Sequence, residues 1–290
     1  MRVPRGLFPI SLLIFVTVQA QIRVIDDLGR TITLSAPARR VVSLAPSLTE
    51  SLFAIGAGGQ VAGITTFCNY PEGTRVLPRV GGMTNPSIER IVSLSPDLVL
   101  VSIEGNTRAD FTRLTTLAIP VYVSNPRTLM GIYRSLTDLG SLTGRSDEAQ
   151  RLVDSLKHKE EMLRSMVSRT PVSTLFLISL HPLIVAGKNT LLNELLTLAG
   201  ARNIAADLEG NYPAISREAI LADNPDVLFM TADLAGETEH LISLFPEWSQ
   251  LNAIRQKKVY RLDTDIVSRP GPRALLGLEL LLACLHGGTQ

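Results

Sequence analysis

Residues 87–100 read SIERIVSLSPDLVL, and residues 216–229 read SREAILADNPDVLF. In both stretches serine comes first, glutamate stands two places later (Glu89 and Glu218), and Pro-Asp begins seven residues after the glutamate. Serine is a favoured N-cap, and an acidic side chain in the first turn is stabilised by the helix dipole. Proline then ends the helix before an apolar run. Each stretch therefore predicts a helix, a turn and a short buried strand.

Two further pairs of segments accompany this repeat. Residues 48–57 resemble residues 192–201, and both predict a helix that is closed by glycine, Gly56 or Gly200. Residues 117–123 resemble the stretch 251–262, and both predict a strand. The parts follow the same order in both halves, which indicates two similar lobes.

The predicted strands are short and almost wholly apolar, as in residues 41–44, 98–101, 175–178 and 227–230. Such strands suit parallel sheets that helices cover on both faces. The fold class expected is therefore α/β, with two Rossmann-like lobes built on parallel sheets.

Between the halves, residues 146–169 are rich in charge, lack glycine and proline, and place apolar residues at helical spacing. We expect one long bridging helix, spanning roughly 35 Å at about 1.5 Å per residue. Periodicity leaves open a helix that packs wholly within one lobe. The expected division is a leader at 1–20, a lobe at 21–143, the bridging helix at 144–170 and a second lobe at 171–290.

The first twenty residues have two arginines, an apolar run at 7–18 and small residues before Gln21. This pattern predicts a cleaved signal peptide and export to the periplasm. Without Arg2 and Arg5, 26 basic residues face 27 acidic ones, so neither nucleic acid nor an anionic membrane surface is favoured as a partner. The leucine-rich stretch 274–285 is too short to span a membrane and predicts a buried helix.

Cys68 and Cys284, the only cysteines, fall in opposite halves. An oxidising compartment would let them pair if their Cα atoms came within about 7 Å. Because free cysteine is commonly buried, we expect two buried free thiols instead.

Motifs for catalysis fail on their spacing. The glycines at 56–63 follow a predicted helix instead of a strand, so they do not lead to a helix N-terminus that could bind a dinucleotide phosphate. No Gly-x-Ser-x-Gly elbow is present. Among the four histidines, only His181 directly follows a predicted strand, and a structural role competes there with ligand binding. The first half has no histidine, which argues against a free-metal site but not against a metal already held by an organic chelator.

Four further segments carry a family resemblance: RVVSLAPSLTE (40–50), CNYP (68–71), VGG (80–82) and SRPGPR (268–273). In this order, together with the repeat, they resemble the periplasmic cobalamin and iron-siderophore binding proteins, and most closely the vitamin B12-binding proteins. The resemblance implies a class III periplasmic binding protein, in which one long helix joins the lobes. It implies a monomeric, non-enzymatic protein without a resident cofactor that delivers a metal chelate to an ABC-transporter permease.

The resemblance also implies roles for particular residues. One glutamate on each lobe, Glu89 and Glu218, would dock onto permease arginines, although ordinary helix capping explains either glutamate alone. The ligand would lie between the lobes, at the carboxyl ends of the strands. The candidate ligand-binding residues are Ser47, Phe67, Tyr70, Gly82, Met83, His181, Tyr212, Asp265 and Arg269.

The expected ligand is a corrinoid, with a ferric siderophore or haem as the alternative. Phe67, Tyr70 and Tyr212 could pack against a corrin ring. The family's cobalamin receptors line this cleft with several tryptophans, whereas the one tryptophan here, Trp248, lies outside those positions. Arg269 and Arg273 could equally pair with anionic groups of a siderophore or with haem propionates.

Overall fold

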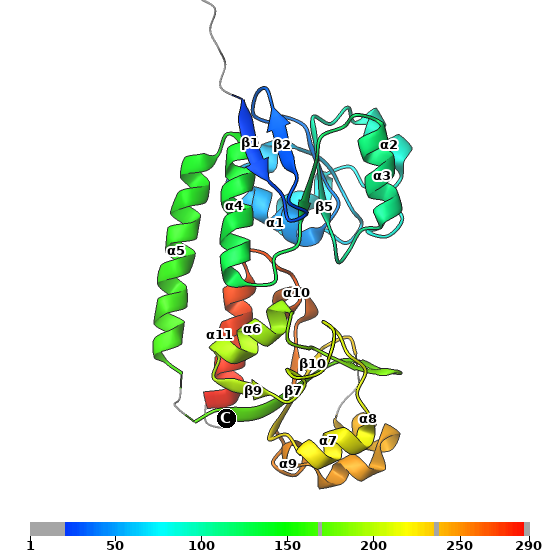
Figure 1. The fold of residues 1–290 in the computed structure, drawn as a ribbon, viewed down its shortest axis with the longest axis vertical. Coiled ribbons are helices and arrows are strands. Elements are labelled where there is room, and N and C mark those ends of the chain that lie inside the picture. Colours follow the sequence, from blue (N-terminus) through cyan, green and yellow to red (C-terminus); the bar gives the residue numbers. More distant parts are fainter. Residues whose placement is uncertain (1–20, 168–169, 235–237, 287–290) are drawn as a thin grey trace, which may run out of the picture.

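The computed structural model describes residues 21–167, 170–234 and 238–286, and it has two α/β lobes joined by a long helix (Figure 1). The stretch at 1–20 predicted to be a signal peptide lies outside the described residues. In the described part of the chain no helix is long and apolar enough to cross a membrane. The two-lobed α/β fold is as predicted.

The N-terminal lobe contains a four-stranded parallel sheet in the order β4-β3-β5-β6. An antiparallel hairpin, β1–β2, precedes it and was not predicted. The elements are β1 (Ile22–Ile25), β2 (Thr31–Leu34), β3 (Val41–Ser43), α1 (Pro46–Ala54), β4 (Val61–Ile64), α2 (Ile88–Ser93), β5 (Leu98–Ser102), α3 (Arg108–Thr116), β6 (Val121–Ser124) and α4 (Leu129–Thr143), with 3₁₀ turns at Gly58–Gln60 and Glu72–Val76.

The C-terminal lobe repeats this arrangement. β9 and β10 both pair in parallel with β7, and β11 pairs in parallel with β10. The order β9-β7-β10-β11 therefore matches β4-β3-β5-β6. The short β8 is an addition that pairs antiparallel with the end of β7. The elements are β7 (Val172–Leu180), β8 (Leu183–Val185), α6 (Leu191–Leu198), β9 (Ala201–Asn203), α7 (Arg217–Asp223), β10 (Val227–Thr231), α8 (Thr238–Leu244), α9 (Asn252–Arg255), β11 (Val259–Leu262), α10 (Thr264–Val267) and α11 (Ala274–His286), with a 3₁₀ turn at Pro246–Gln250.

The repeat extends to the backbone conformation of its turns. In the first repeat the residue before proline has a positive φ in both lobes, 47° at Ser95 and 42° at Asn224. The glycines that close α1 and α6 do the same, with 76° at Gly56 and 80° at Gly200. Left-handed backbone at matching places shows that both lobes turn from helix to strand in the same way.

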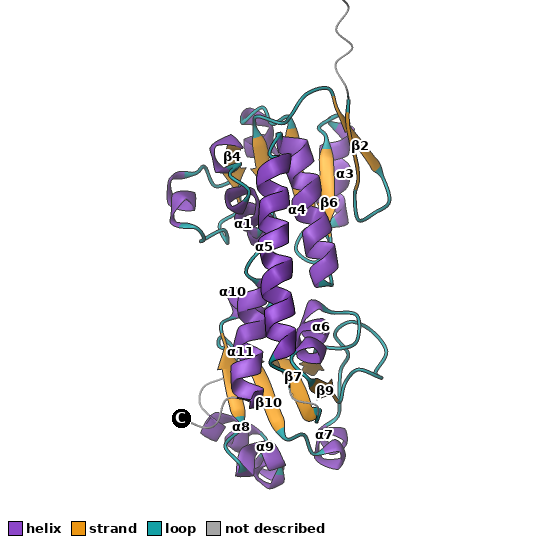
Figure 2. Ribbon diagram, turned by 90° about the vertical axis from the view of Figure 1, so that its left-hand side faces the viewer, coloured by secondary structure: helices purple, strands orange, loops and turns teal. Residues whose placement is uncertain are grey.

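The bridging helix is α5 (Ser146–Ser165), which begins where predicted and ends at Ser165 instead of continuing towards residue 169. It packs along α4 of the N-terminal lobe and also touches α11 of the C-terminal lobe, where Lys159 Nζ lies 3.0 Å from Glu279 Oε1. Figure 2 shows α5 running past both lobes. The alternative in which this helix packs within one lobe is therefore wrong.

Each sheet is covered on both faces. α2 and α3 cover one face of the N-terminal sheet, while α7, α8 and α9 cover one face of the C-terminal sheet. The other faces share one apolar cluster that is continuous through α1, α4, α6 and α11, from Leu52 and Leu136 to Leu195 and Leu278. The two lobes are thus joined by a shared core as well as by α5.

The two cysteines are free, as predicted. Cys68 is buried and lies 3.2 Å from the hydroxyls of Thr49 and Thr65. Cys284 was predicted to be buried, but it lies half-exposed on α11, where it packs against the margin of the shared apolar cluster.

Candidate functional site

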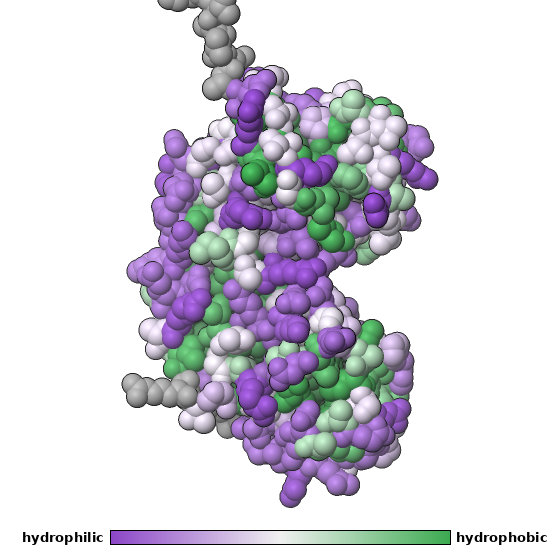
Figure 3. Space-filling model, in the orientation of Figure 1, coloured by the Kyte–Doolittle hydropathy of each residue, from purple (hydrophilic) through white to green (hydrophobic). Residues whose placement is uncertain are grey.

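A cavity of about 430 Å³ opens between the lobes. Its walls come mainly from segments that follow the carboxyl ends of strands, the usual place for ligands in open α/β sheets. The surface is hollowed between the lobes, on the side away from α5 (Figure 3). We call this cavity the cleft.

Apolar side chains form much of the cleft wall, and polar groups are spread among them. The apolar members include Phe67, Met83, Ile178, Leu192 and Tyr212. Phe67 and Tyr212 remain 58% and 42% exposed, which is unusual for aromatic rings and leaves both faces of the cleft with an accessible aromatic surface. The polar members include Ser47, Ser102, Glu104, Asn125 and Asp265.

Six of the nine predicted ligand-binding residues line the cleft: Ser47, Phe67, Met83, Tyr212, Asp265 and Arg269. The first three come from the N-terminal lobe and the last three from the C-terminal lobe. The cleft thus brings together residues that are far apart in the chain.

The other three predicted residues do not line the cleft. The ring of Tyr70 lies under the guanidinium of Arg273, whose Cζ is 4.3 Å from the ring centroid. A Cβ on Gly82 would come within 2.2 Å of the Asn85 side chain, so Gly82 permits a close turn behind Phe67. His181 sits in the β7–β8 turn with its ring centroid 6.0 Å from that of Phe245. β8 turns back at this point, and the segment therefore does not enter the cleft.

Sequence reasoning missed several cleft residues at or just beyond strand ends, notably Ser102, the last residue of β5, Glu104 after β5 and Asn125 after β6. The rule that ligands meet the carboxyl ends of parallel strands would have found them. Ile178 and Leu192 carried no such signal.

A second cavity of similar volume, about 430 Å³, lies within the N-terminal lobe among Leu28, Ile103 and Phe111. Its surface is mainly apolar, although Asn106, Thr107 and Arg108 also line it, and it is formed by one lobe alone. The cleft fits a ligand site better, because convergent polar groups are what orient a ligand in an apolar pocket.

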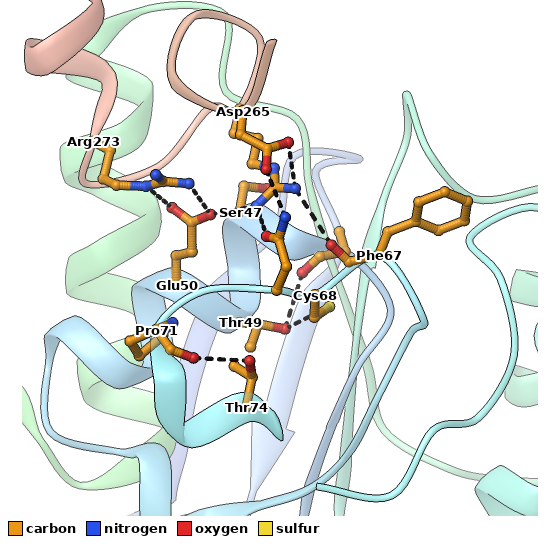
Figure 4. A network of polar contacts seen from close by, with 12 residues as sticks. Ser47, Thr49, Glu50, Phe67, Cys68, Pro71, Thr74, Asp265 and Arg273 are labelled. Carbon is orange, nitrogen blue, oxygen red and sulfur yellow. Dashed lines mark hydrogen bonds and ion pairs between the residues drawn. The ribbon is translucent and has the colours of Figure 1, made fainter. Parts of the chain in front are cut away.

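Arg269 and Arg273 are held by acidic residues at the boundary between the lobes (Figure 4). Glu50 Oε1 lies 2.8 Å from Arg269 Nη1 and 2.7 Å from Arg273 Nη2, and Glu50 Oε2 lies 2.7 Å from Arg273 Nε. Asp265 Oδ1 forms a second ion pair with Arg269, at 2.5 Å from its Nη2. The hydrogen bond from Arg273 to Glu50 raises the pKa of the Arg273 guanidinium. Both arginines are thus ion-paired.

Tyr212 projects from the C-terminal lobe towards the N-terminal lobe. Its hydroxyl donates to Glu104 Oε2 at 3.4 Å, and Glu104 Oε1 lies 3.8 Å from Arg127 Nε. Burial and the nearby Glu104 carboxylate raise the pKa of Tyr212 to about 12. The phenol therefore stays protonated at neutral pH.

Glu89 and Glu218 occupy matching places on α2 and α7. Ser87 and Ser216 cap these helices, accepting from the amides of Arg90 and Ala219, so each glutamate lies in the first turn. Both carboxylates are exposed, and hydrogen bonds from their own backbone amides and the capping serines lower their pKa values. Figure 1 shows α2 and α7 on different lobes, away from α5. Each lobe thus presents an ionised carboxylate at a matching place on its outer surface.

Comparison with known proteins identifies a family and relatives for this chain. Residues 41–266 match the family model described as "Periplasmic binding protein". A Bacillus subtilis protein named "Uncharacterized ABC transporter substrate-binding lipoprotein YvrC" is 32% identical over 91% of this chain and 86% of its own length. The "Vitamin B12-binding protein" of Vibrio cholerae is 29% identical over 84% of this chain and 87% of its own.

Solved structures share the fold. The crystal structure of the periplasmic vitamin B12 binding protein BtuF of Vibrio cholerae superposes with a TM-score of 0.75 at 29% identity, covering 86% of this chain and 97% of that one. The periplasmic haem-binding protein RhuT from Roseiflexus superposes with a TM-score of 0.77 at 27% identity, covering 85% and 98%. With two lobes, a bridging helix and an interlobe cleft, the chain belongs to the periplasmic binding protein family, the substrate-binding proteins of ABC transporters.

Proposed function

We propose that this protein binds a corrinoid of the vitamin B12 class in the cleft and delivers it to the permease of an ABC importer in the periplasm. The role is one of binding and delivery, without catalysis. The charge and polarity of the cleft are the observation that carries the choice of ligand.

A corrin ring has a broad apolar face and a rim of amide side chains. Phe67, Met83 and Tyr212 offer apolar surface on both sides of the cleft. Ser47 and Asn125 can exchange hydrogen bonds with amides, and Glu104 can accept them. The wall therefore matches both parts of a corrinoid.

Anionic chelates fit less well. Arg269, the only cation among the described residues that line the cleft, is already paired with Glu50 and Asp265. Haem propionates or a siderophore carboxylate would have to compete with these carboxylates for the guanidinium.

Haem remains the second candidate because haem-binding proteins share the fold and because Tyr212 reaches the cleft. A phenolate is a ligand for ferric iron, but the raised pKa of Tyr212 opposes loss of its proton. This feature favours the corrinoid, against which Tyr212 needs only to pack.

Delivery to the permease would use Glu89 and Glu218. Each is exposed and ionised in a helix first turn, and the two-lobed repeat places one on each lobe. A permease with two-fold symmetry would present two equivalent arginine sites to them.

The test is equilibrium binding by protein lacking residues 1–20, offered cobinamide, cobalamin, haem or ferric siderophores. Visible absorbance and quenching of the Trp248 fluorescence would report binding. We expect a corrinoid to bind with a micromolar or lower Kd. Corrinoid binding no tighter than about 1 mM, a free energy of only about −4 kcal/mol, beside tight haem binding would reject the proposal.

A further inference from the structure

Glu50 stands behind the cleft wall, in the second turn of α1. Its side chain is only 2% exposed, and its carboxylate meets the two guanidinium groups of Arg269 and Arg273 from the other lobe. Glu50 does not line the cleft, but Arg269 does. A buried residue outside the ligand site thus sets the charge of a residue within it.

The cluster is balanced. Two carboxylates, Glu50 and Asp265, face two guanidinium groups, Arg269 and Arg273, so the net charge is zero. Asn69 completes the network: its amide donates to Asp265 Oδ2 at 2.8 Å, and its carbonyl accepts from Arg269 Nη1 at 2.8 Å. The carbonyl oxygen of Phe67 also accepts from Arg269, at 3.3 Å.

This balance affects what the cleft can bind. An unpaired arginine in a partly buried site attracts carboxylates strongly, because guanidinium and carboxylate form paired, charge-assisted hydrogen bonds. A neutralised arginine offers no such gain. The carboxylate of Glu104, which lies in the wall outside this cluster, then disfavours an anionic ligand.

We propose that Glu50 is a specificity-determining residue, which neutralises Arg269 and Arg273 so that the cleft selects amide-bearing chelates over carboxylate-bearing ones. This inference rests on the proposed corrinoid function and deepens it. Glu50 acts through the arginines and does not touch the ligand itself.

Two corrinoids with the same ring provide the test. Cobinamide carries amides around the corrin rim, whereas cobyrinic acid carries carboxylates in their place. The measured quantity is the ratio of their Kd values for the wild type, Glu50→Gln and Asp265→Asn. Glu72→Gln is the matched control, because Glu72 is an exposed glutamate of the same lobe.

In Glu50→Gln the cluster keeps its shape but gains one net positive charge. We expect the Kd ratio to shift at least about tenfold towards cobyrinic acid, equivalent to 1.4 kcal/mol. The shift should shrink at high salt, since it is electrostatic. Asp265→Asn should act in the same direction, and it carries the test if Glu50→Gln does not fold. Glu72→Gln should leave the ratio unchanged.

A merely structural role for Glu50 would weaken both corrinoids equally, and an unchanged ratio in both variants overturns the inference. Failure of the proposed function looks different, because the wild type would then bind neither corrinoid. The same variants would in that case be compared on haem and its dimethyl ester, in which methyl esters replace the two charged propionates. An unchanged ratio for that pair also overturns the inference.

Discussion

Glu50 and Glu194 occupy equivalent positions in the internal repeat, and each carboxylate forms a hydrogen bond to the other lobe. Glu50, on α1, accepts from Arg269 and Arg273, which belong to the segment between α10 and α11. Glu194, on α6, accepts from the amide of Leu129, the first residue of α4, at 2.7 Å. Since α4 and α11 are themselves equivalent, each glutamate holds the start of the other lobe's last helix.

These contacts bear on how far the lobes can move. The continuous apolar cluster through α1, α4, α6 and α11 and the single stiff α5 already join the lobes. Domains that share a large apolar interface move less than domains joined by linkers alone. Small adjustments of the cleft are therefore expected on ligand binding, instead of a wide hinge closure.

Replacing Glu50 by alanine should destabilise the fold strongly. The change leaves Arg269 and Arg273, with side chains 13% and 17% exposed, without their shared partner. Removing one member of such a buried pair costs about 3 kcal/mol. Urea unfolding would measure the loss, with the exposed Glu72→Ala as reference. A loss below about 1 kcal/mol would mean that the pairing adds little.

Glu194 should respond differently to its two simplest substitutions. Glu194→Ala leaves the Leu129 amide without its acceptor and should cost about 1 kcal/mol, the usual value of a lost N-cap. Glu194→Gln keeps a carbonyl acceptor and removes a carboxylate that is expensive to desolvate.

The pKa of Glu194 determines how the stability of the protein changes with pH. Burial raises the pKa of Glu194, so the stability linked to its protonated form is present at acid pH and is lost as pH rises through the folded-state pKa. Glu194→Gln should therefore gain stability relative to the wild type as pH rises above the usual pKa of glutamate, as followed by thermal unfolding at a series of pH values. A difference that is constant with pH would contradict this account.

The lobes could be predicted from sequence because the repeat encodes them locally. Serine caps, first-turn glutamates and Pro-Asp boundaries around 87–100 and 216–229 specify helix, turn and strand without distant contacts. β8 and the β1–β2 hairpin could not be predicted in this way. Each is a short hairpin with the preceding strand, β2 with β1 and β8 with β7, and both lie outside the segments that the internal repeat compares.

The cleft was predictable to the extent that it follows strand ends. Ser47, Phe67 and Asp265 lie just beyond β3, β4 and β11 and were found in this way. His181 also follows a strand, but β8 folds the chain back there. The pairing of Arg269 with Glu50 joins residues more than two hundred positions apart, and no local pattern indicates that such an arginine is already neutralised.

Tyr212 separates the two ligand candidates. If a corrin ring packs on it, Tyr212→Phe should bind a corrinoid within about twofold of the wild type, while Tyr212→Ala should lose about tenfold, in line with the contribution of an aromatic contact. If the phenol instead coordinated haem iron, Tyr212→Phe alone would remove the charge-transfer bands from the visible spectrum. Titrations of both variants with cobinamide and haem would show which of these two roles Tyr212 has.

Backbone strain in the turn before β11 can be tested by substitution. Lys257 has a φ of 56° in the turn before β11, and the residue is exposed. Glycine adopts this conformation without the Cβ clash, so Lys257→Gly should stabilise the protein by up to about 1 kcal/mol. In contrast, Thr116→Gly, at the end of α3, should destabilise it. Urea midpoints of the two variants would distinguish these opposite signs.

Docking through Glu89 and Glu218 is best tested by separating transport from ligand binding. Glu89→Ala and Glu218→Ala should each weaken binding to the permease about tenfold, and the double variant should lose transport, because exposed carboxylates on two lobes lose their guanidinium partners. Corrinoid affinity should stay unchanged, since neither residue lines the cleft. Glu72→Ala and Glu209→Ala, exposed glutamates of the same two lobes, are the matched controls.

The capping serines add a prediction about pH. Hydrogen bonds from their backbone amides, and then from Ser87 and Ser216, hold the pKa values of the two glutamates below the usual range. Docking that depends on ionised carboxylates should therefore persist as pH falls to the usual pKa of glutamate and weaken only below it. In Ser87→Ala/Ser216→Ala the loss should begin at higher pH. Uptake by proteoliposomes containing the permease would measure both, and transport by the double glutamate variant at the wild-type rate would show that docking uses another surface.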